Sequence, residues 1–258
     1  MLTWASRGSS PPQRALRLKT VVAFARHIHA EDDRHDVPPA DTFGGYQIRR
    51  RLPFIFSRDD VSLLMEEAAR LKPVGSLRPR VYSTLFGLLA VTGMRVSEAL
   101  ALRFEDLTAE GIVIRKTKFG KSRLVPLHES TTAAIEQYVA VRQQVSAADD
   151  HLFISWRRRR LSYSAAALVF WRLVQALRFD RRPGQRRPRL HDLRHSFATR
   201  ALESSPEHRD AVGRHMVALS TYLGHSDVRN TYWYLEATPR LLTDIASTCE
   251  AHFQGGLR

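Results

Sequence analysis

Two pairs of side chains stand at helical spacing in this sequence, and both pairs suit the binding of a phosphate group. Arg95 follows a glycine break, and Glu98 lies three residues later on the same helical face, where its carboxylate can orient the guanidinium. His191 and Arg194 are likewise one helical turn apart. A guanidinium fork matches phosphate oxygens and stays charged, while an imidazole exchanges a proton near neutral pH. Each pair alone is more often structural, so neither identifies a site by itself.

Two lysines, a further histidine and two phenols supply other groups that phosphoryl transfer needs. Lys118 and Lys121 lie at the tip of a predicted hairpin, where an ammonium can reach a ligand. His225 ends a Leu-Gly-His triplet, and the phenols of Tyr232 and Tyr234 follow it. A phenol has an ordinary pKa of about 10, so it becomes a nucleophile at neutral pH only with help from its neighbours. The arrangement as a whole is far less often accidental than any single segment.

The elements that must position these residues are predicted to be mostly helical, with one small antiparallel sheet. A change of hydrophobic period predicts two strands, 111–117 and 122–127, with 118–121 as their turn, and a short strand at 152–154. Ser57 is the predicted N-cap of one helix and Gly93 the end of the next. Residues 1–12 are predicted to be frayed. The predicted helices are 13–30, 58–71, 80–92, one from 96, 131–145, 164–177, 191–203, 216–223, 228–236 and 239–253.

Composition narrows the class of partner. The 258 residues include 40 Lys and Arg against 26 Asp and Glu, a formal charge of +14, which predicts an anionic partner such as nucleic acid. The alternative is a basic solvated surface. The single cysteine, Cys249, excludes a disulfide within the chain and a thiolate metal cluster. The N-terminus lacks a signal-peptide pattern and the most apolar stretch, 81–94, is too short to span a bilayer, so we expect a soluble cytoplasmic protein.

The order of these motifs resembles the phage-integrase family of tyrosine recombinases over residues 53–240. That family has an Arg in a Thr-Gly-x-Arg-x-x-Glu box, a Lys on a β-hairpin, His-x-x-Arg, Leu-Gly-His, and a Tyr about nine residues later. The run Thr-Tyr-Trp-Tyr-Leu-Glu-Ala-Thr-Pro further resembles a subgroup of bacterial transposon-borne recombinases of mobile elements. The matching residues are Arg95 with supporting Glu98, Lys118, His191, Arg194, His225 and Tyr234.

The resemblance implies a DNA breaking-and-rejoining catalytic domain of the α+β type at 53–258 and a site-specific strand exchange. The tyrosine attacks a DNA phosphodiester, a 3′-phosphotyrosyl link forms and a 5′-hydroxyl leaves; a second 5′-hydroxyl then reverses the step on a new strand. Because the covalent link conserves energy, no cofactor is expected. The carboxylate clusters of a two-metal site are missing near these motifs, so we also expect catalysis without a metal.

The residue types explain how this chemistry would work. Attack builds charge on the non-bridging oxygens, which Arg95 and Arg194 would stabilise with one more hydrogen bond from His225. His191 would accept the phenol proton, and Lys118 would protonate the leaving 5′-oxygen.

Two assignments have a competitor nearby. Tyr234 lies nine residues after His225, the family spacing, while Tyr232 lies only seven after it, so we take Tyr234 as the nucleophile. Lys118 precedes the turn residues, as the family's lysine does, and Lys121 is then a DNA-backbone contact.

Zinc binding is an alternative for the two histidines of the third motif. His191 and His195 are at i and i+4, a spacing that can bind zinc on a helix. However, Asp192 stands where a metalloprotease helix has glutamate, and Arg194 would repel a cation. We therefore expect His195 to pack or to touch the DNA backbone.

Three arginine runs suit a clamp that neutralises the phosphates of duplex DNA, although each alone can be a solvated loop. They lie in the linker, between the predicted short strand and the following helix, and just before His191. The predicted DNA-binding residues are Arg49, Arg50, Arg51, Lys121, Arg157, Arg158, Arg159, Arg160, Arg181, Arg182, Arg186 and Arg187.

The N-terminal segment departs from the family. Members usually carry a helical core-binding domain before the catalytic domain, whereas residues 1–52 offer one convincing helix and a basic linker. We interpret residues 1–52 as a remnant of that domain, which predicts weaker DNA affinity. The gap between His191 and His225 is also long, and the polar segment Glu203–His215 is interpreted as an insertion.

The resemblance implies double-stranded DNA as partner, a homotetramer on two DNA sites with a monomer in the absence of DNA, and accessory recombinases. It also implies a bacterial, nucleoid-associated protein. Two other functions compete. One is a DNA-binding protein that has lost strand exchange through N-terminal truncation. The other is a metal-dependent phosphoesterase that uses the histidines.

Overall fold

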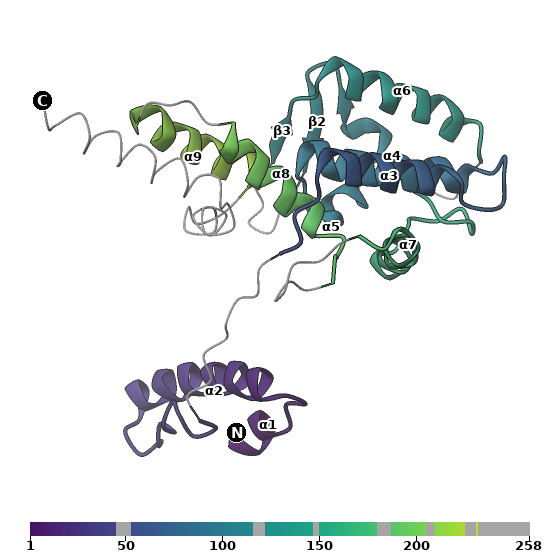
Figure 1. Cartoon of the computed structure of the whole chain (residues 1–258). Helices are drawn as coiled ribbons and strands as arrows, with labels where there is room; N and C mark the ends of the chain where they lie inside the picture. Colours follow the sequence, from purple (N-terminus) through teal and green to yellow (C-terminus); the bar gives the residue numbers. More distant parts are fainter. Residues whose placement is uncertain are drawn as a thin grey trace, which may run out of the picture. The chain divides into compact units, whose positions relative to one another are not determined.

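The computed structural model (Figure 1) divides the chain into two units, Met1–Arg51 and Leu52–Arg258, which are described separately. Of residues 209–213 only the backbone is described. Within the described residues, no helix is long and apolar enough to cross a membrane. The structure describes residues 1–44, 53–115, 122–146, 150–179, 187–204, 209–224 and 231.

One long helix dominates the first unit. Helix α2 (Pro11–Glu31) starts with proline, which is suited to a first helical turn because its missing N–H would have no partner there. Helix α1 (Leu2–Ser6) packs against it, and Arg17 both stacks on the Trp4 ring, 4.9 Å from its centroid, and donates to the Trp4 carbonyl oxygen at 3.1 Å. The predicted long helix is confirmed. The prediction that residues 1–12 are frayed is wrong, because these contacts hold α1 in place.

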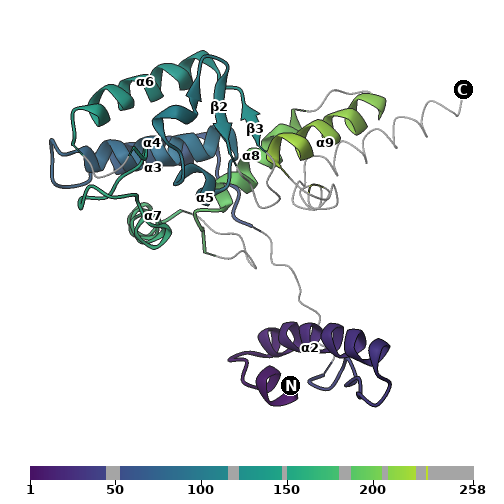
Figure 2. The ribbon, with the colours of Figure 1, turned by 180° about the vertical axis from the view of Figure 1, so that it is seen from behind.

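Two helices lie side by side at the centre of the second unit (Figures 1 and 2). They are α3 (Arg58–Ala69) and α4 (Leu77–Thr92). Helix α4 is buried around most of its circumference, and it packs on α6 (Glu129–Gln143) and α8 (Asp192–Glu203) as well as on α3. Helix α7 (Tyr163–Leu177) packs on α3. The C-terminal end of α4 is therefore held in the core and can serve as a fixed support for a site.

The start of α3 and the end of α4 follow from particular residues. The backbone N–H of Asp60 donates to Ser57 Oγ at 3.0 Å, and the Ser57 N–H donates to Asp60 Oδ2 at 2.8 Å, which is a capping box. Gly93 ends α4 in the left-handed region, with φ of 59°. Both predicted boundaries are confirmed.

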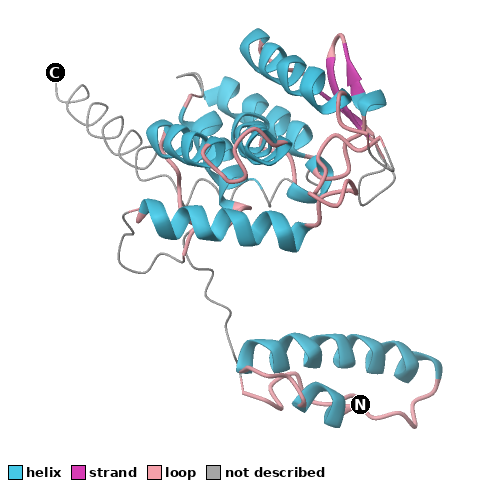
Figure 3. Ribbon diagram, turned by 90° about the vertical axis from the view of Figure 1, so that its right-hand side faces the viewer, coloured by secondary structure: helices cyan, strands magenta, loops and turns pink. Residues whose placement is uncertain are grey.

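A three-stranded antiparallel sheet has the order β1-β2-β3. Figure 3 shows strands of this sheet in magenta at the edge of an otherwise helical unit. Its strands are β1 (Leu107–Thr108), β2 (Gly111–Ile114) and β3 (Arg123–Val125). The predicted hairpin is confirmed, its turn at 118–121 lies outside the described residues, and β1 adds a strand. The strand predicted at 152–154 is wrong: the chain forms only isolated bridges here, one at His151 with Arg103 and one at Ile154 with Arg160.

Three further segments belong to the described part of the second unit. Helix α5 (Val96–Ala99) is short and is followed by the 3₁₀ turn η1 (Phe104–Asp106). Helix α9 (Arg209–Leu223) begins well before the predicted Met216, so part of the segment interpreted as a polar insertion is helical. The helices predicted at 228–236 and 239–253 lie outside the described residues, apart from Thr231, which is helical.

Gly93 leaves no room for a side chain, and this gives a first testable expectation. A Cβ on Gly93 would lie 2.3 Å from Cδ1 of Phe197. We expect Gly93→Ala to lower the free energy of unfolding by about 2–5 kcal/mol, because left-handed strain adds to overpacking. Chemical denaturation measures this change.

Gly75 is the matched control for that variant. It has φ of 79°, and nothing lies within 4 Å of a Cβ built on it. Gly75→Ala should therefore cost only the backbone strain, about 1–2 kcal/mol. Equal losses in the two variants would show that the Phe197 ring moves aside without cost.

Candidate active site

Arg95 begins the first segment of the site and is held by its own helical turn. It is the N-cap residue of α5, and its backbone N–H donates to Glu98 Oε2 at 2.9 Å. Its guanidinium donates from Nη1 to Glu98 Oε1 at 2.8 Å. The Glu98 side chain is 9% exposed and that of Arg95 34%, so the carboxylate is buried beneath a guanidinium that still reaches solvent.

Arg194 lies on the first turn of α8 and joins the ends of two other helices. Its side chain is buried. Nη1 donates to the carbonyl oxygen of Gly93 at 2.7 Å, and Nη2 donates to that of Leu223 at 2.8 Å. The buried carboxylate of Asp192 accepts the backbone N–H of Arg189 at 2.8 Å and so fixes the entry to α8.

The two arginines meet at the turn that ends α9. Arg95 donates from Nη2 to the carbonyl oxygen of Gly224 at 2.7 Å, next to the Leu223 carbonyl that Arg194 binds. Three segments far apart in the sequence therefore converge: the ends of α4 and α9 and the start of α8. The structure brings Arg95, Glu98 and Arg194 together, and their roles in a reaction stay a prediction.

His191 lies in the same cluster and carries a strongly shifted pKa. It is the N-cap residue of α8. Burial, and then the charges of Arg194, Arg189 and Arg95, lower its pKa to about 4. Its ring is thus neutral at pH 7 and is able to accept a proton.

This shift makes stability depend on pH in a definite direction. An imidazole in the unfolded chain has a pKa near 6.5, so between that value and about 4 only the unfolded state binds the proton. The contribution of His191 is complete above pH 6.5. As the pH falls toward 4, about 3 kcal/mol of unfolding free energy is lost.

Urea denaturation of the wild type and of His191→Gln at pH 7 and pH 4.5 checks this expectation. The wild type should lose more stability than His191→Gln over that interval. His27→Gln, which replaces an exposed histidine of the first unit, controls for the loss of a histidine as such. An equal loss in the wild type and in His191→Gln would contradict the buried, neutral state of His191.

The two histidines of this motif stand edge to face. The ring centroids of His191 and His195 are 4.8 Å apart at an interplanar angle of 88°. Among the described residues, no group of three or more His, Cys, Asp or Glu side chains is arranged to hold a metal ion. The charges that act on His191 are those of arginines, as expected for an anion site.

Arg123 belongs to this cluster and was missed by sequence reasoning. It is the first residue of β3, and its guanidinium donates to Glu98 Oε2 at 2.7 Å and to Oε1 at 3.1 Å. Burial would raise the pKa of Glu98, but hydrogen bonds from Arg123 and Arg95 and the Arg123 charge hold it below its ordinary value. The missed signal is strand alternation: Arg123 shares the inward face with buried Val125, while Leu124 between them is exposed.

One phenol stands close to the cluster. Tyr222 stacks on Phe197 with ring centroids 5.6 Å apart. Burial raises its pKa, although the charges of Arg123 and Arg194 oppose the shift. Tyr222 therefore stays protonated at neutral pH and is a poor nucleophile.

The predicted DNA-binding arginines in the described residues are exposed. Arg157, Arg158 and Arg159 form the tip of a tight turn with Trp156, which is 81% exposed, and Arg157 lies over the Trp156 ring. Arg160 is exposed too, but its Nε donates to the Leu100 carbonyl oxygen at 2.9 Å. Arg187 is also exposed. The predicted site residues outside the described residues are Lys118, Lys121, His225, Tyr232, Tyr234, Arg49, Arg50, Arg51, Arg181, Arg182 and Arg186.

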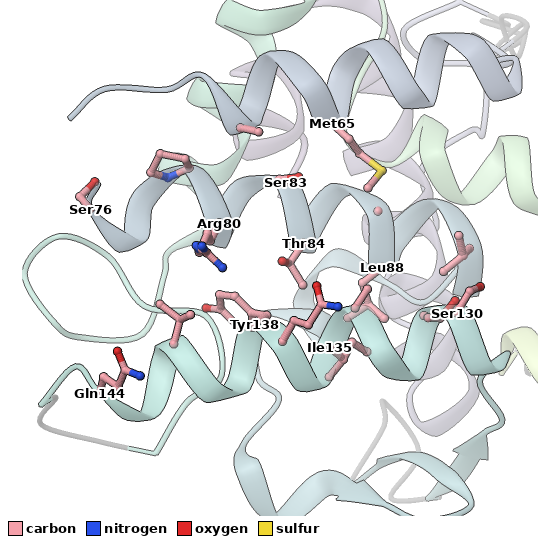
Figure 4. A pocket seen from close by; sticks show the side chains of 18 of the residues that line it. Met65, Ser76, Arg80, Ser83, Thr84, Leu88, Ser130, Ile135, Tyr138 and Gln144 are labelled. Atoms are coloured by element: carbon pink, nitrogen blue, oxygen red, sulfur yellow. The ribbon is translucent and has the colours of Figure 1, made fainter. Parts of the chain in front are cut away.

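A groove of about 860 Å³ lies between α4 and α6, away from the arginine cluster. Figure 4 shows Thr84 and Leu88 of α4 facing Ile135 and Tyr138 of α6 across it, with Met65 of α3 above. Arg95, His191 and Arg194 do not line it. Arg95 and Glu98 line a different hollow, of about 650 Å³, between α5 and the sheet.

Comparison with known proteins identifies the family. The phage integrase family profile matches residues 55–240, which include Arg95, His191 and Arg194. The chain belongs to the phage integrase family. The tyrosine-recombinase resemblance stated from the sequence motifs is therefore confirmed.

Relatives within the phage integrase family match along most of the chain. The putative integrase/recombinase y4rB of Sinorhizobium fredii is 37% identical over 98% of this chain and 83% of its own length. The tyrosine recombinase XerC of Shewanella amazonensis is 30% identical over 88% of this chain and 71% of its own length. A crystal structure of the XerH site-specific recombinase bound to its difH substrate has a TM-score of 0.71 and 19% identity, over 96% of this chain and 70% of that one. The predicted fold, mostly helical with a small antiparallel sheet, is thus confirmed as the tyrosine-recombinase fold.

Proposed function

We propose that this chain is a site-specific DNA recombinase that cuts and rejoins strands through a tyrosine. One observation carries the proposal: Arg95 and Arg194 bind the Leu223–Gly224 turn, ten residues before Tyr234, and their charges act on a neutral His191. Attack on a phosphodiester requires cations to stabilise the charge on its oxygens and a base to accept the proton of the nucleophile. The two guanidiniums stay charged and the imidazole is neutral, so together they supply both.

In the proposed reaction, the bond between the Tyr234 oxygen and phosphorus forms as the bond from phosphorus to the 5′-oxygen breaks. The phenol proton passes to His191, and Lys118 gives a proton to the leaving oxygen. Arg95 and Arg194 stabilise the charge on the non-bridging oxygens, with a hydrogen bond from His225. A 5′-hydroxyl from another strand reverses these transfers, so no nucleotide is consumed and no metal takes part in the scheme.

Duplex DNA is the proposed partner. The chain carries a formal charge of +14, and the exposed Arg157–Arg159 turn and Arg187 can neutralise backbone phosphates. The same role is proposed for Lys121 and for the arginines at 49–51, 181–182 and 186. We further propose a homotetramer on two DNA sites, work on nucleoid DNA in the bacterial cytoplasm, and a mobile element as the source of those sites.

A nicked suicide duplex tests the proposal. The full chain is first bound to a pool of randomised duplexes, and the sequence that it selects is taken as its site. That site is then synthesised with a nick beside the cleavage point, so that the short fragment carrying the leaving 5′-hydroxyl dissociates and cannot reverse the reaction. We expect a protein–DNA adduct that survives denaturation, with the DNA 3′-phosphate on a tyrosine when the peptide is mapped by mass spectrometry. The adduct should form in the presence of EDTA.

The two competing functions give different results in this assay. A DNA-binding protein without strand exchange would retain the duplex and form no adduct. A metal-dependent phosphoesterase would release cleaved DNA without a covalent link and would stop in EDTA. The match to y4rB along nearly the whole chain, together with the arginine cluster, favours the recombinase over both.

A further inference from the structure

Arg123 connects the hairpin to the arginine cluster through a nearly buried ion pair. Its side chain is 12% exposed and that of Glu98 9%. Both carboxylate oxygens of Glu98 accept from Arg123, and each also accepts from Arg95: Oε1 from its guanidinium and Oε2 from its backbone N–H. The Glu98 carboxylate therefore balances the charges of two guanidiniums, and both arginines hold it in position.

Both arginines also touch the turn that ends α9. Arg95 donates to the Gly224 carbonyl oxygen, and a Cβ on Gly224 would lie only 2.7 Å from Nη1 of Arg123. Arg123, Arg95 and Gly224 therefore close a ring around the Glu98 carboxylate. Because two like charges would otherwise separate, the carboxylate is what keeps both guanidiniums beside the turn that leads to His225.

The position of Arg123 in the sheet gives this ring a second consequence. Arg123 pairs with Ile114 of β2, and Lys118 lies in the sequence between these two residues. The strand that follows Lys118 is therefore tied, at its first residue, to the same carboxylate that orients Arg95.

We propose that Arg123 is a positioning residue of the recombination reaction, which holds Glu98 and thereby Arg95 in place while anchoring the base of the Lys118 hairpin beside them. The proposal rests on the recombinase function above. It assigns Arg123 no contact with the reacting atoms. The role requires a guanidinium, because its planar arrangement of N–H groups donates to both carboxylate oxygens at once. A lysine ammonium cannot reproduce that geometry.

The test compares Arg123 with the other arginine at the base of the same hairpin. Arg115 makes an ion pair as well, from Nε to Asp106 Oδ1 at 2.7 Å, but it does not contact Glu98. In single-turnover cleavage of the nicked duplex, we expect Arg123→Gln to slow adduct formation by about 10–100-fold with unchanged DNA affinity. Arg123→Lys should recover part of the rate, and Arg115→Gln should cleave at the wild-type rate.

A double-mutant cycle separates positioning from a general structural role. If Arg123 acts through Glu98, the variant with both Arg123→Gln and Glu98→Gln should cleave no more slowly than the worse single variant. Additive losses would overturn the proposal. So would equal rates in Arg123→Gln and Arg115→Gln.

Two further results keep the test decisive. If Arg123→Gln does not fold, Arg123→Lys, which keeps the charge, must still slow cleavage without lowering the melting temperature; an unchanged rate there overturns the proposal. A wild-type chain that forms no adduct at all defeats the recombinase function itself, whereas an active wild type with an unaffected Arg123→Gln defeats the role of Arg123 alone.

Discussion

Tyr234→Phe abolishes the covalent adduct with the nicked duplex, and Tyr232→Phe leaves it intact: this is the largest effect that we expect of any single substitution. The change to phenylalanine keeps the ring and removes only the oxygen that would attack phosphorus. Arg194 and Arg95 donate hydrogen bonds to the carbonyl oxygens of Leu223 and Gly224, at the end of α9. The segment that leads to Tyr234 therefore begins beside the guanidiniums that would stabilise the charge on the phosphate oxygens. Denaturing electrophoresis of the labelled duplex measures the adduct.

Tyr232→Phe is the matched control because it makes the same chemical change two residues earlier. Both variants should bind the intact duplex as the wild type does, since neither loses a charge. An adduct that persists in Tyr234→Phe and disappears in Tyr232→Phe would move the nucleophile to Tyr232. An adduct that persists in both variants would exclude Tyr232 and Tyr234 as the nucleophile.

Boundaries set by local chemistry could be predicted from the sequence. Ser57 and Asp60 make reciprocal hydrogen bonds that involve only neighbouring residues, and Gly93 adopts a conformation that glycine tolerates best. The site itself was predicted through the order of its motifs. Its convergence depends on contacts such as that of Arg194 with Gly93, 101 residues apart, which spacing alone does not indicate.

Features that depend on tertiary partners were missed. The segment 152–154 is short and apolar, which predicts a strand, but the backbones of Leu152 and Phe153 hydrogen-bond to two different loop segments rather than to a neighbouring strand. The first half of α9 lacks apolar periodicity, so its start was placed too late. Arg123 was overlooked because a charged strand residue is usually solvated, and the Glu98 carboxylate that draws it inward is contributed by another element.

Arg194→Ala is the second substitution with a large expected effect, because Arg194 has both a structural and an electrostatic role. The change removes a charge beside the proposed phosphate site and leaves two buried carbonyl oxygens, those of Gly93 and Leu223, without their donor. We expect cleavage to slow by at least about 10³-fold. Unfolding free energy should fall by about 2–5 kcal/mol. Arg194→Lys keeps the charge but not the fork, so it should recover only part of both losses.

Arg200 on the same helix separates the two roles. It also donates to two carbonyl oxygens, those of Phe56 at 2.9 Å and Ala90 at 3.2 Å, but it takes no part in the cluster around Gly224. Arg200→Ala should therefore lower the melting temperature and leave the cleavage rate unchanged at temperatures where the variant is folded. If the two alanine variants slow cleavage equally, then Arg194 contributes to the reaction only by holding α4 and α9 together, and the stabilisation of the phosphate charge falls to Arg95 and to residues after Gly224.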